Sequence, residues 1–157
     1  MKTLIVYASK TGTTEKCAGT VAQNLKDVTI INLASQNEDI SKYDLIIVGT
    51  PIRMGMIHKK VKRFISKNVE VLKTKKVAYF ICCGFSENYK QYFEQNIPKV
   101  LLDKAIIYDT FGGEMDITKQ KGFDKFITKI VSKNMDESKE IKILNNNINN
   151  FIDKVLL

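Results

Sequence analysis

The stretch TLIVYASKTGTT, residues 3–14, joins an apolar run to a turn rich in hydroxyl side chains. The run from Lys2 to Ala8 is short and contains β-branched residues, which predicts a strand. The turn follows at once, and an apolar pattern with helical spacing then continues to about Leu25. The stretch therefore predicts a strand, a tight turn and a helix in direct succession.

The turn has the composition of a phosphate-binding loop. Four of the six residues after Ala8 carry hydroxyl groups, and the helix that begins near Thr14 directs free N–H groups and its positive dipole end into the turn. One hydroxyl would be enough to cap the helix, so four favour a bound phosphate. The sequence differs from a Walker loop and from the Gly-x-Gly-x-x-Gly turn of dinucleotide folds. The residues predicted to hold the phosphate are Ser9, Lys10, Thr11, Gly12, Thr13 and Thr14.

Four more apolar runs predict the remaining strands, at residues 28–32, 45–49, 77–83 and 105–111. The run at residues 45–49 has no polar alternation, which is typical of a strand buried on both faces of a parallel sheet. Helical patterns lie between and after the runs, including one at residues 89–96. The alternation of strands and helices predicts an α/β fold, with a doubly wound five-stranded parallel sheet and helices on both of its faces. The length predicts a single domain over residues 1–157.

Composition excludes several other classes of protein. The chain is 44% hydrophobic and 27% charged, which is ordinary for a globular protein and excludes a disordered or collagen-like chain. Its apolar runs are far shorter than the ~20 residues of a membrane-spanning helix, and its start lacks a secretory signal, so we expect a cytoplasmic protein. Three cysteines and one histidine, His58, provide no metal-ligand pattern, so no metal is expected. We expect the cysteines to pack as small apolar residues and His58 to be exposed.

Most of the glycines follow predicted strands. Gly12 follows the first strand, Gly49 and Gly55 bracket the segment after the third, and Gly84 follows the fourth. In an open α/β sheet a ligand binds outside the carboxyl ends of the strands, near the point where the strand order reverses. Because glycine permits positive φ and close backbone approach, these loops predict one shared ligand site.

The loop SKTGTT directly after the first strand resembles the FMN-phosphate loop of the flavodoxin family, and the strand pattern fits that fold over essentially the whole chain. The resemblance implies the strand order 2-1-3-4-5 and FMN as the cofactor. It implies that the isoalloxazine ring lies between two further loops, the first of which contributes a backbone group to flavin N5, here at Met54 and Gly55. The residues of these two loops are Thr50, Pro51, Ile52, Arg53, Met54 and Gly55, and Cys83, Gly84 and Phe85.

The side chains of these loops suit a flat ring that is apolar on both faces. Ile52, Met54 and Met56 can form one wall, and Phe85 or Tyr89 the other. The resemblance assigns no catalytic side chain.

The charge distribution departs from an ordinary flavodoxin. The formal net charge is +8, and residues 45–69 contain no Asp or Glu but six positive residues, Arg53, Lys59, Lys60, Lys62, Arg63 and Lys67. Flavodoxins that act as electron carriers are typically acidic. Positive charge near the flavin favours its reduced, anionic form, so we expect a less negative reduction potential here. It also favours anionic partners.

A second departure is the segment between the fifth strand and the last helix. Residues 121–134 have the pattern of a basic amphipathic helix, which packs on the sheet or rests on an anionic membrane. Together with the basic residues, this segment resembles the flavodoxin-type menaquinone-dependent protoporphyrinogen oxidases. The segment after the fourth strand is shorter here than the insertion that those enzymes carry.

Two functions follow from these resemblances. The first is an FMN electron carrier that passes electrons between a reductase and acceptor proteins or small molecules. The alternative is an FMN-dependent, quinone-linked oxidoreductase that acts on an anionic porphyrinogen and contacts the membrane surface. A receiver domain would need clustered acidic residues after the first and third strands, and the sequence has none there. No nucleic-acid partner is expected, because no reading motif accompanies the charge.

Overall fold

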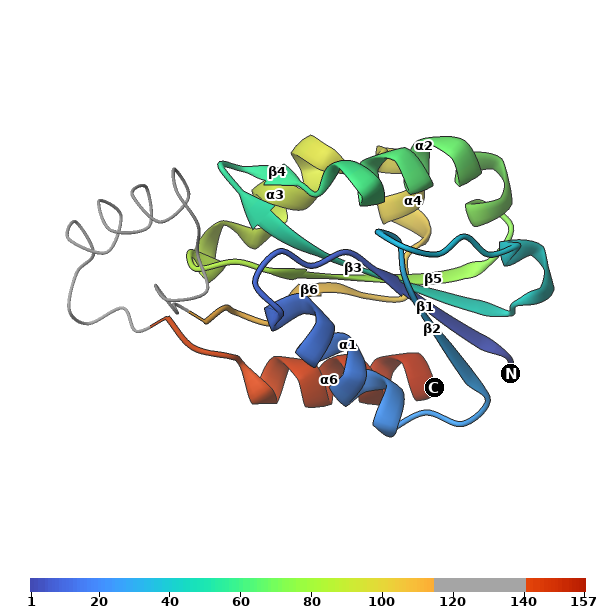
Figure 1. Cartoon of the computed structure of the whole chain (residues 1–157), viewed down its shortest axis with the longest axis horizontal. Helices are drawn as coiled ribbons and strands as arrows, with labels where there is room; N and C mark the ends of the chain where they lie inside the picture. The colour runs from blue at the N-terminus through green and yellow to red at the C-terminus, as the bar shows by residue number, and fades with distance from the viewer. Residues whose placement is uncertain (115–140) are drawn as a thin grey trace.

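The structure, a computed structural model, describes residues 1–114 and 141–157. In this part of the chain five parallel strands form a sheet in the order β2-β1-β3-β5-β6 (Figure 1). A short strand, β4, pairs antiparallel with the end of β3. The predicted order 2-1-3-4-5 is confirmed, because the five predicted strands correspond to β1, β2, β3, β5 and β6. Their bounds are β1 Thr3–Tyr7, β2 Val28–Asn32, β3 Leu45–Arg53, β4 Met56–Ile57, β5 Lys76–Cys82 and β6 Tyr108–Thr110.

Helices cover both faces of this sheet, as predicted (Figure 1). Helices α1 (Thr13–Gln23) and α6 (Asn145–Leu156) lie on one face. Helices α2 (Lys59–Leu72), α3 (Tyr89–Asn96) and α4 (Lys99–Lys104) lie on the other. The helix predicted at residues 121–134 falls outside the described residues. None of the described helices combines the length and apolarity that a membrane crossing requires.

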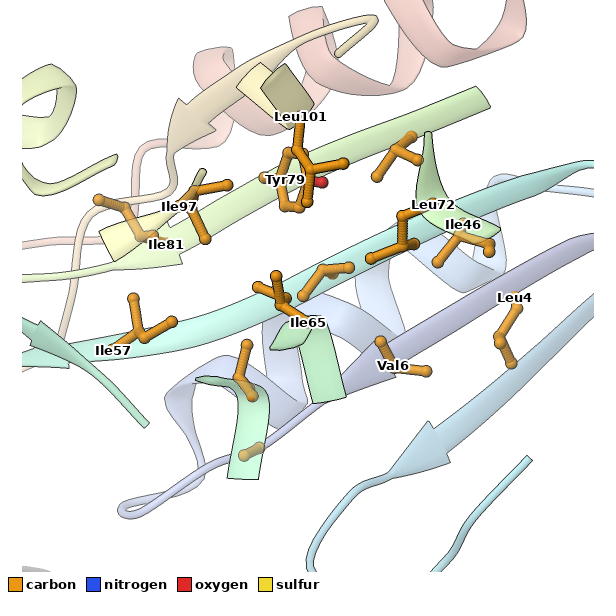
Figure 2. Packing of buried hydrophobic residues seen from close by; sticks show 14 of the residues in the cluster. Leu4, Val6, Ile46, Ile57, Ile65, Leu72, Tyr79, Ile81, Ile97 and Leu101 are labelled. Atoms are coloured by element: carbon orange, nitrogen blue, oxygen red, sulfur yellow. The ribbon is translucent and has the colours of Figure 1, made fainter. Parts of the chain in front are cut away.

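Each face of the sheet packs into its own apolar core, because successive side chains of a strand point to opposite faces. Leu4 and Val6 of β1 face α2, and Ile5 and Tyr7 face α1. Figure 2 shows the first core, where strand residues such as Ile46 pack with helix residues that include Ile65, Leu72 and Leu101. The cysteines follow the expected pattern: all three are buried, with Cys17 and Cys82 in one core and Cys83 in the other.

Gly49 has a packing role that the sequence pattern did not indicate. It lies inside β3, opposite Phe80 of β5, and the strand continues beyond it. A Cβ atom on Gly49 would lie 2.2 Å from Cζ of Phe80. The Phe80 ring in turn stacks on Phe111, with ring centroids 4.4 Å apart. Glycine is therefore needed for this aromatic cluster to lie across the strand.

Several elements differ from the sequence prediction. β4 was not predicted, and β6 covers Tyr108–Thr110 rather than residues 105–111. β3 continues to Arg53 instead of ending at Gly49, so Thr50, Pro51, Ile52 and Arg53 belong to a strand and not to a loop. Helix α4 was not predicted, because its six residues are too few to show a helical period. The longer β3 continues past the end of β1, and the hairpin at its end lies beside α3.

Candidate cofactor site at the carboxyl edge of the sheet

The loops that follow β1, β3 and β5 leave the sheet at the same edge, on the left of Figure 1. From β1 the chain crosses to β2 on one side, and β3 lies on the other side of β1. The strand order therefore reverses between β1 and β3, which is where open α/β sheets bind ligands. The structure thus brings the three predicted loops to one edge of the sheet.

The first loop opens onto the N-terminus of α1. Gly12 is the N-cap residue in a left-handed conformation, with φ 96°, and no side chain caps the helix. The Gly12 N–H donates to Oγ of Ser9 at 3.0 Å, which curls the turn. The first N–H groups of a helix have no partner within the helix, and they carry its positive dipole end. This turn is therefore suited to a phosphate.

The threonines of this loop differ in their environment. Thr11 is half-buried, whereas Thr13 and Thr14 are buried. Thr14 is 1% exposed, so its side chain lies inside the protein. The group that Thr14 can offer to a ligand is consequently its backbone N–H, while the hydroxyls of Thr11 and Thr13 are the ones we expect to contact a phosphate.

The second loop is a tight β-hairpin. Arg53 of β3 pairs with Met56 of β4, which leaves Met54 and Gly55 as a two-residue turn. Both have positive φ, 53° and 76°. This is the pattern of a type I′ turn, whose twist matches that of paired strands. Met54 is 81% exposed and Met56 52% exposed, so the hairpin presents two soft apolar side chains to solvent.

Thr50 and His58 tie the base of this hairpin to α2. Oγ1 of Thr50 accepts a hydrogen bond from the His58 backbone N–H at 3.0 Å. His58 is half-buried rather than exposed, and its Nδ1 accepts from the Lys60 N–H, which caps α2. Burial, and then the charges of Lys10 and Lys60, lower the pKa of His58. Thr50 is thus buried and internally bonded, so its role is to support the hairpin from beneath.

Asn96, at the end of α3, is a site residue that the sequence analysis missed. Its Nδ2 donates to the Gly55 carbonyl at 2.8 Å, and its Oδ1 accepts from the Ile57 N–H at 3.2 Å. The same side chain also bonds to the Tyr92 carbonyl of its own helix. Asn96 therefore fastens the hairpin to α3. No local signal marks it, because its partners lie about forty residues away in the sequence.

The third loop combines a buried cysteine with two exposed residues. The Cys83 N–H donates to the Gly112 carbonyl at 2.8 Å, and its Sγ lies 3.5 Å from Oγ1 of Thr110. Burial raises the pKa of the Cys83 thiol. Gly84 and Phe85 are exposed, with Phe85 36% exposed. In this loop the backbone and Phe85 are accessible to a ligand, and the thiol is not.

The residues present fit FMN. An anion site at α1 and exposed apolar side chains on two neighbouring loops are what a phosphate and a flat aromatic ring require. Of the side chains predicted to line the ring, Met54, Met56 and Phe85 are exposed. Ile52 and Tyr89 are partly buried and pack against the core, so they can support the site from within.

Comparisons with known proteins agree with this geometry. A sequence model of the flavodoxin domain matches residues 4–142. An uncharacterized protein of Methanocaldococcus jannaschii is 32% identical over 153 residues, which cover 82% of this chain and 99% of that protein. Protoporphyrinogen IX dehydrogenase (quinone) of Escherichia coli is 23% identical over 144 residues, covering 85% of this chain and 80% of that one.

Solved structures show the same fold. A flavoprotein from Lactobacillus acidophilus, in complex with FMN, superposes with a TM-score of 0.56 at 19% identity, over 69% of this chain and 92% of that chain. The matched domain model spans all three loops at the carboxyl edge of the sheet. The chain belongs to the flavodoxin family.

Proposed function

We propose that this protein uses FMN to carry electrons between a reductase and acceptor proteins. FMN is the cofactor of its family, and when bound it supplies reversible one- and two-electron chemistry. The observation that carries the proposal is the uncapped N-terminus of α1 at Gly12, at the same sheet edge as the exposed Met54 and Phe85.

Each loop has a separate part in this function. The turn at residues 9–14 binds the phosphate through backbone N–H groups and the hydroxyls of Thr11 and Thr13. The hairpin places the Met54–Gly55 backbone and the Met54 side chain along the ring, and Phe85 covers it from the third loop. Because these ring-lining residues are exposed, a partner protein can approach the ring edge closely enough for electron transfer.

Flavin titration tests the binding step. Wild-type apoprotein should quench FMN fluorescence on binding, and the double variant Thr11→Val with Thr13→Val should bind FMN at least about tenfold more weakly, because hydrogen bonds to a charged group contribute about 1.5–3 kcal/mol each. Riboflavin lacks the phosphate, so its affinity should be nearly the same in both proteins. Thr20→Val, farther along α1, is the matched control and should bind FMN as the wild type does.

Two results would contradict the binding step. One is wild-type protein that takes up no FMN. The other is a double variant with unchanged preference for FMN over riboflavin.

Reduction kinetics test the carrier step. The FMN-loaded protein should be reduced by NADPH in the presence of a catalytic amount of a flavodoxin reductase, and it should then pass electrons to a one-electron acceptor protein. A loaded protein that neither accepts electrons from a reductase nor delivers them to a protein acceptor would contradict the proposal.

A quinone-linked porphyrinogen oxidase is the second candidate. It is favoured by the similarity to the Escherichia coli dehydrogenase over 85% of the chain and by the six basic residues at positions 53–67. An anionic porphyrinogen and an anionic membrane surface would both suit that charge. Mixing the loaded protein with protoporphyrinogen and a menaquinone analogue separates the candidates, since quinone-dependent porphyrin fluorescence is expected from the oxidase alone.

A further inference from the structure

We infer that the outer face of α2, together with the adjacent β3–β4 hairpin, is the docking surface for an acidic redox protein. The basic face of α2 consists of Lys59, Lys60, Arg63 and Lys67. The inference rests on the proposed carrier function and adds the position of the interface and the charge of the partner.

The four side chains of the basic face are all exposed. The opposite side of α2 packs against the sheet in the apolar core. Val61, Ile65 and Leu72 are buried against the sheet. Within residues 1–114 and 141–157, none of the recorded ion pairs involves a member of the basic face. Among the described residues its charges are therefore not consumed by ion pairs, which leaves them available to a partner.

The placement of these charges works against the stability of α2. Lys59 and Lys60 occupy the first turn, which has no acidic residue, and the positive dipole end of a helix disfavours cations there. Lys59, Arg63 and Lys67 are spaced four residues apart, where like charges repel. Sites that break local rules in this way are expected to be functional.

The basic face begins next to the candidate cofactor site. Only Ile57 and His58 separate Met56 of the hairpin from Lys59, the first residue of α2. Burial, and then the charges of Lys10 in the phosphate turn and of Lys60 in α2, lower the pKa of His58, so positive charge from both the first loop and α2 acts on this residue. An exposed pair of methionines beside basic side chains matches the anatomy of protein interfaces, which have an apolar centre and a polar rim.

The chemistry of this surface favours a protein over a membrane. A helix that lies in a membrane interface inserts its own apolar side, and the apolar side of α2 is occupied by the core. The exposed large apolar side chains of the hairpin are those of Met54 and Met56, and flexible methionines adapt well to a protein surface. A partner with acidic side chains around its redox centre would complement both the charge and the position of the face.

Titration of the FMN-loaded protein with two charged probes tests the inference. The probes are a plant-type ferredoxin, which is acidic, and cytochrome c, which is basic. In ¹⁵N-labelled protein at low salt, ferredoxin should shift amide signals of α2 and of residues 52–57, and cytochrome c should not. Binding of ferredoxin should weaken steeply as salt is raised, because exposed charges are screened.

Two triple variants with equal net charge distinguish the effect of charges on the basic face from the effect of the net charge of the protein. Lys59→Gln with Lys60→Gln and Arg63→Gln should weaken ferredoxin binding about tenfold at low salt, and the difference should shrink at high salt. Lys26→Gln with Lys76→Gln and Lys154→Gln removes exposed charges elsewhere and should bind within about twofold of wild type. Thermal melts and FMN affinity of both variants check that the fold and the cofactor site are intact.

Three outcomes would overturn the inference. The first is equal loss of ferredoxin binding in both variants, and the second is a preference for cytochrome c. The third is binding to phosphatidylglycerol vesicles through the basic face with no affinity for ferredoxin, which would assign the face to a membrane. Failure of the proposed function is distinguishable, because it appears as the absence of a flavin spectrum or, in the loaded protein, as the absence of electron exchange with a reductase or a protein acceptor.

Discussion

The side chain of Asn96 bonds to both Gly55 and Ile57, so one residue of α3 holds the turn and the return strand of the β3–β4 hairpin. The Nδ2 of Asn96 lies 2.8 Å from the Gly55 carbonyl oxygen, and Oδ1 lies 3.2 Å from the Ile57 nitrogen. Because Gly55 is bonded in this way, the Met54–Gly55 segment that we expect beside the flavin has a defined position before the cofactor binds. Preorganisation of this kind lowers the cost of binding.

Loss of the Asn96 bonds should loosen the hairpin. Asn96→Leu keeps the approximate size of the side chain but leaves two backbone groups without partners, and we expect the free energy of unfolding to fall by about 1–3 kcal/mol. FMN affinity should fall as well. Gln91→Leu, on the exposed side of the same helix, is the control and should change neither quantity appreciably. Urea unfolding and FMN titration measure the two effects.

Asn96→Asp distinguishes the two bonds. The aspartate can still accept from the Ile57 N–H, but it places a carboxylate oxygen against the Gly55 carbonyl. It should therefore weaken FMN binding through the turn while β4 stays paired. Wild-type FMN affinity in both variants would show that the hairpin does not depend on Asn96.

Met54 carries backbone strain that another residue would relieve. Its φ of 53° lies in the left-handed region, where a non-glycine residue other than Asn or Asp is unfavourable. Met54→Asn creates the preferred Asn-Gly type I′ turn and should stabilise the apoprotein by about 0.5–1 kcal/mol. The same variant should bind FMN more weakly, because it removes an apolar contact with the ring. Higher stability together with weaker FMN binding in this variant would show that Met54 is strained in the apoprotein and contributes to FMN binding.

Gly55→Ala provides the complementary measurement. With φ 76° at this position, the alanine should destabilise the apoprotein by about 1 kcal/mol. A Gly55→Ala protein as stable as wild type would contradict the assigned turn. Both stability changes can be measured by urea unfolding without cofactor.

The buried hydroxyl of Tyr79, in the core behind the site, should lower the stability of the protein. Its side chain is 1% exposed, and its hydroxyl has no hydrogen-bond partner among the described residues. Burial accordingly raises the pKa of Tyr79 well above its usual value. Tyr79→Phe removes an unsatisfied buried group and should raise the free energy of unfolding by about 1 kcal/mol.

Tyr43→Phe is the matched control for this change. The Tyr43 hydroxyl donates to Oε1 of Glu38 at 3.2 Å, so its removal should lower stability by about 0.5–1.5 kcal/mol. Equal destabilisation by both substitutions would mean that the Tyr79 hydroxyl has a partner in solution.

The central strands β1, β3 and β5 could be predicted from the sequence because most of their residues are buried, which gives continuous apolar runs. Val28–Asn32 was predicted with its observed bounds, and the start of β3 at Leu45 was also correct. The end of β3 was missed because Thr50-Pro51 reads as a break. β1 ends at Tyr7, opposite Gly49, so one side of β3 is free of strand pairing beyond that point, and a proline is tolerated there.

The candidate site was only partly predictable for a related reason. The phosphate turn is a local feature: a strand, a glycine and a helix N-terminus in succession define it without distant contacts. The hairpin geometry and its attachment to α3 depend on hydrogen bonds from a side chain to distant backbone groups, which leave no periodic pattern. Sequence spacing therefore located the loops but could not identify Asn96 or the buried position of Thr50.

His58 should make stability depend on pH between neutral and mildly acidic conditions. Its Nδ1 accepts the Lys60 N–H at 3.1 Å, which requires the neutral ring, and burial with the charges of Lys10 and Lys60 lowers its pKa below the usual value near 6.5. The unfolded chain then binds the proton more readily. The stabilising contribution is complete above about pH 6.5, decreases as the pH falls through that value, and is lost below the folded pKa.

His58→Asn isolates this contribution, because asparagine keeps an acceptor for the cap of α2 but does not titrate. Carboxylates also change protonation as the solution is acidified, but they do so equally in both proteins, so the difference between wild type and variant reports His58 alone. Urea unfolding of the two apoproteins at pH 7.5, 6.5 and 5.5 should show a wild type that loses stability relative to the variant on acidification. Parallel curves across this range would mean that the imidazole is as free to protonate in the folded protein as in the unfolded chain.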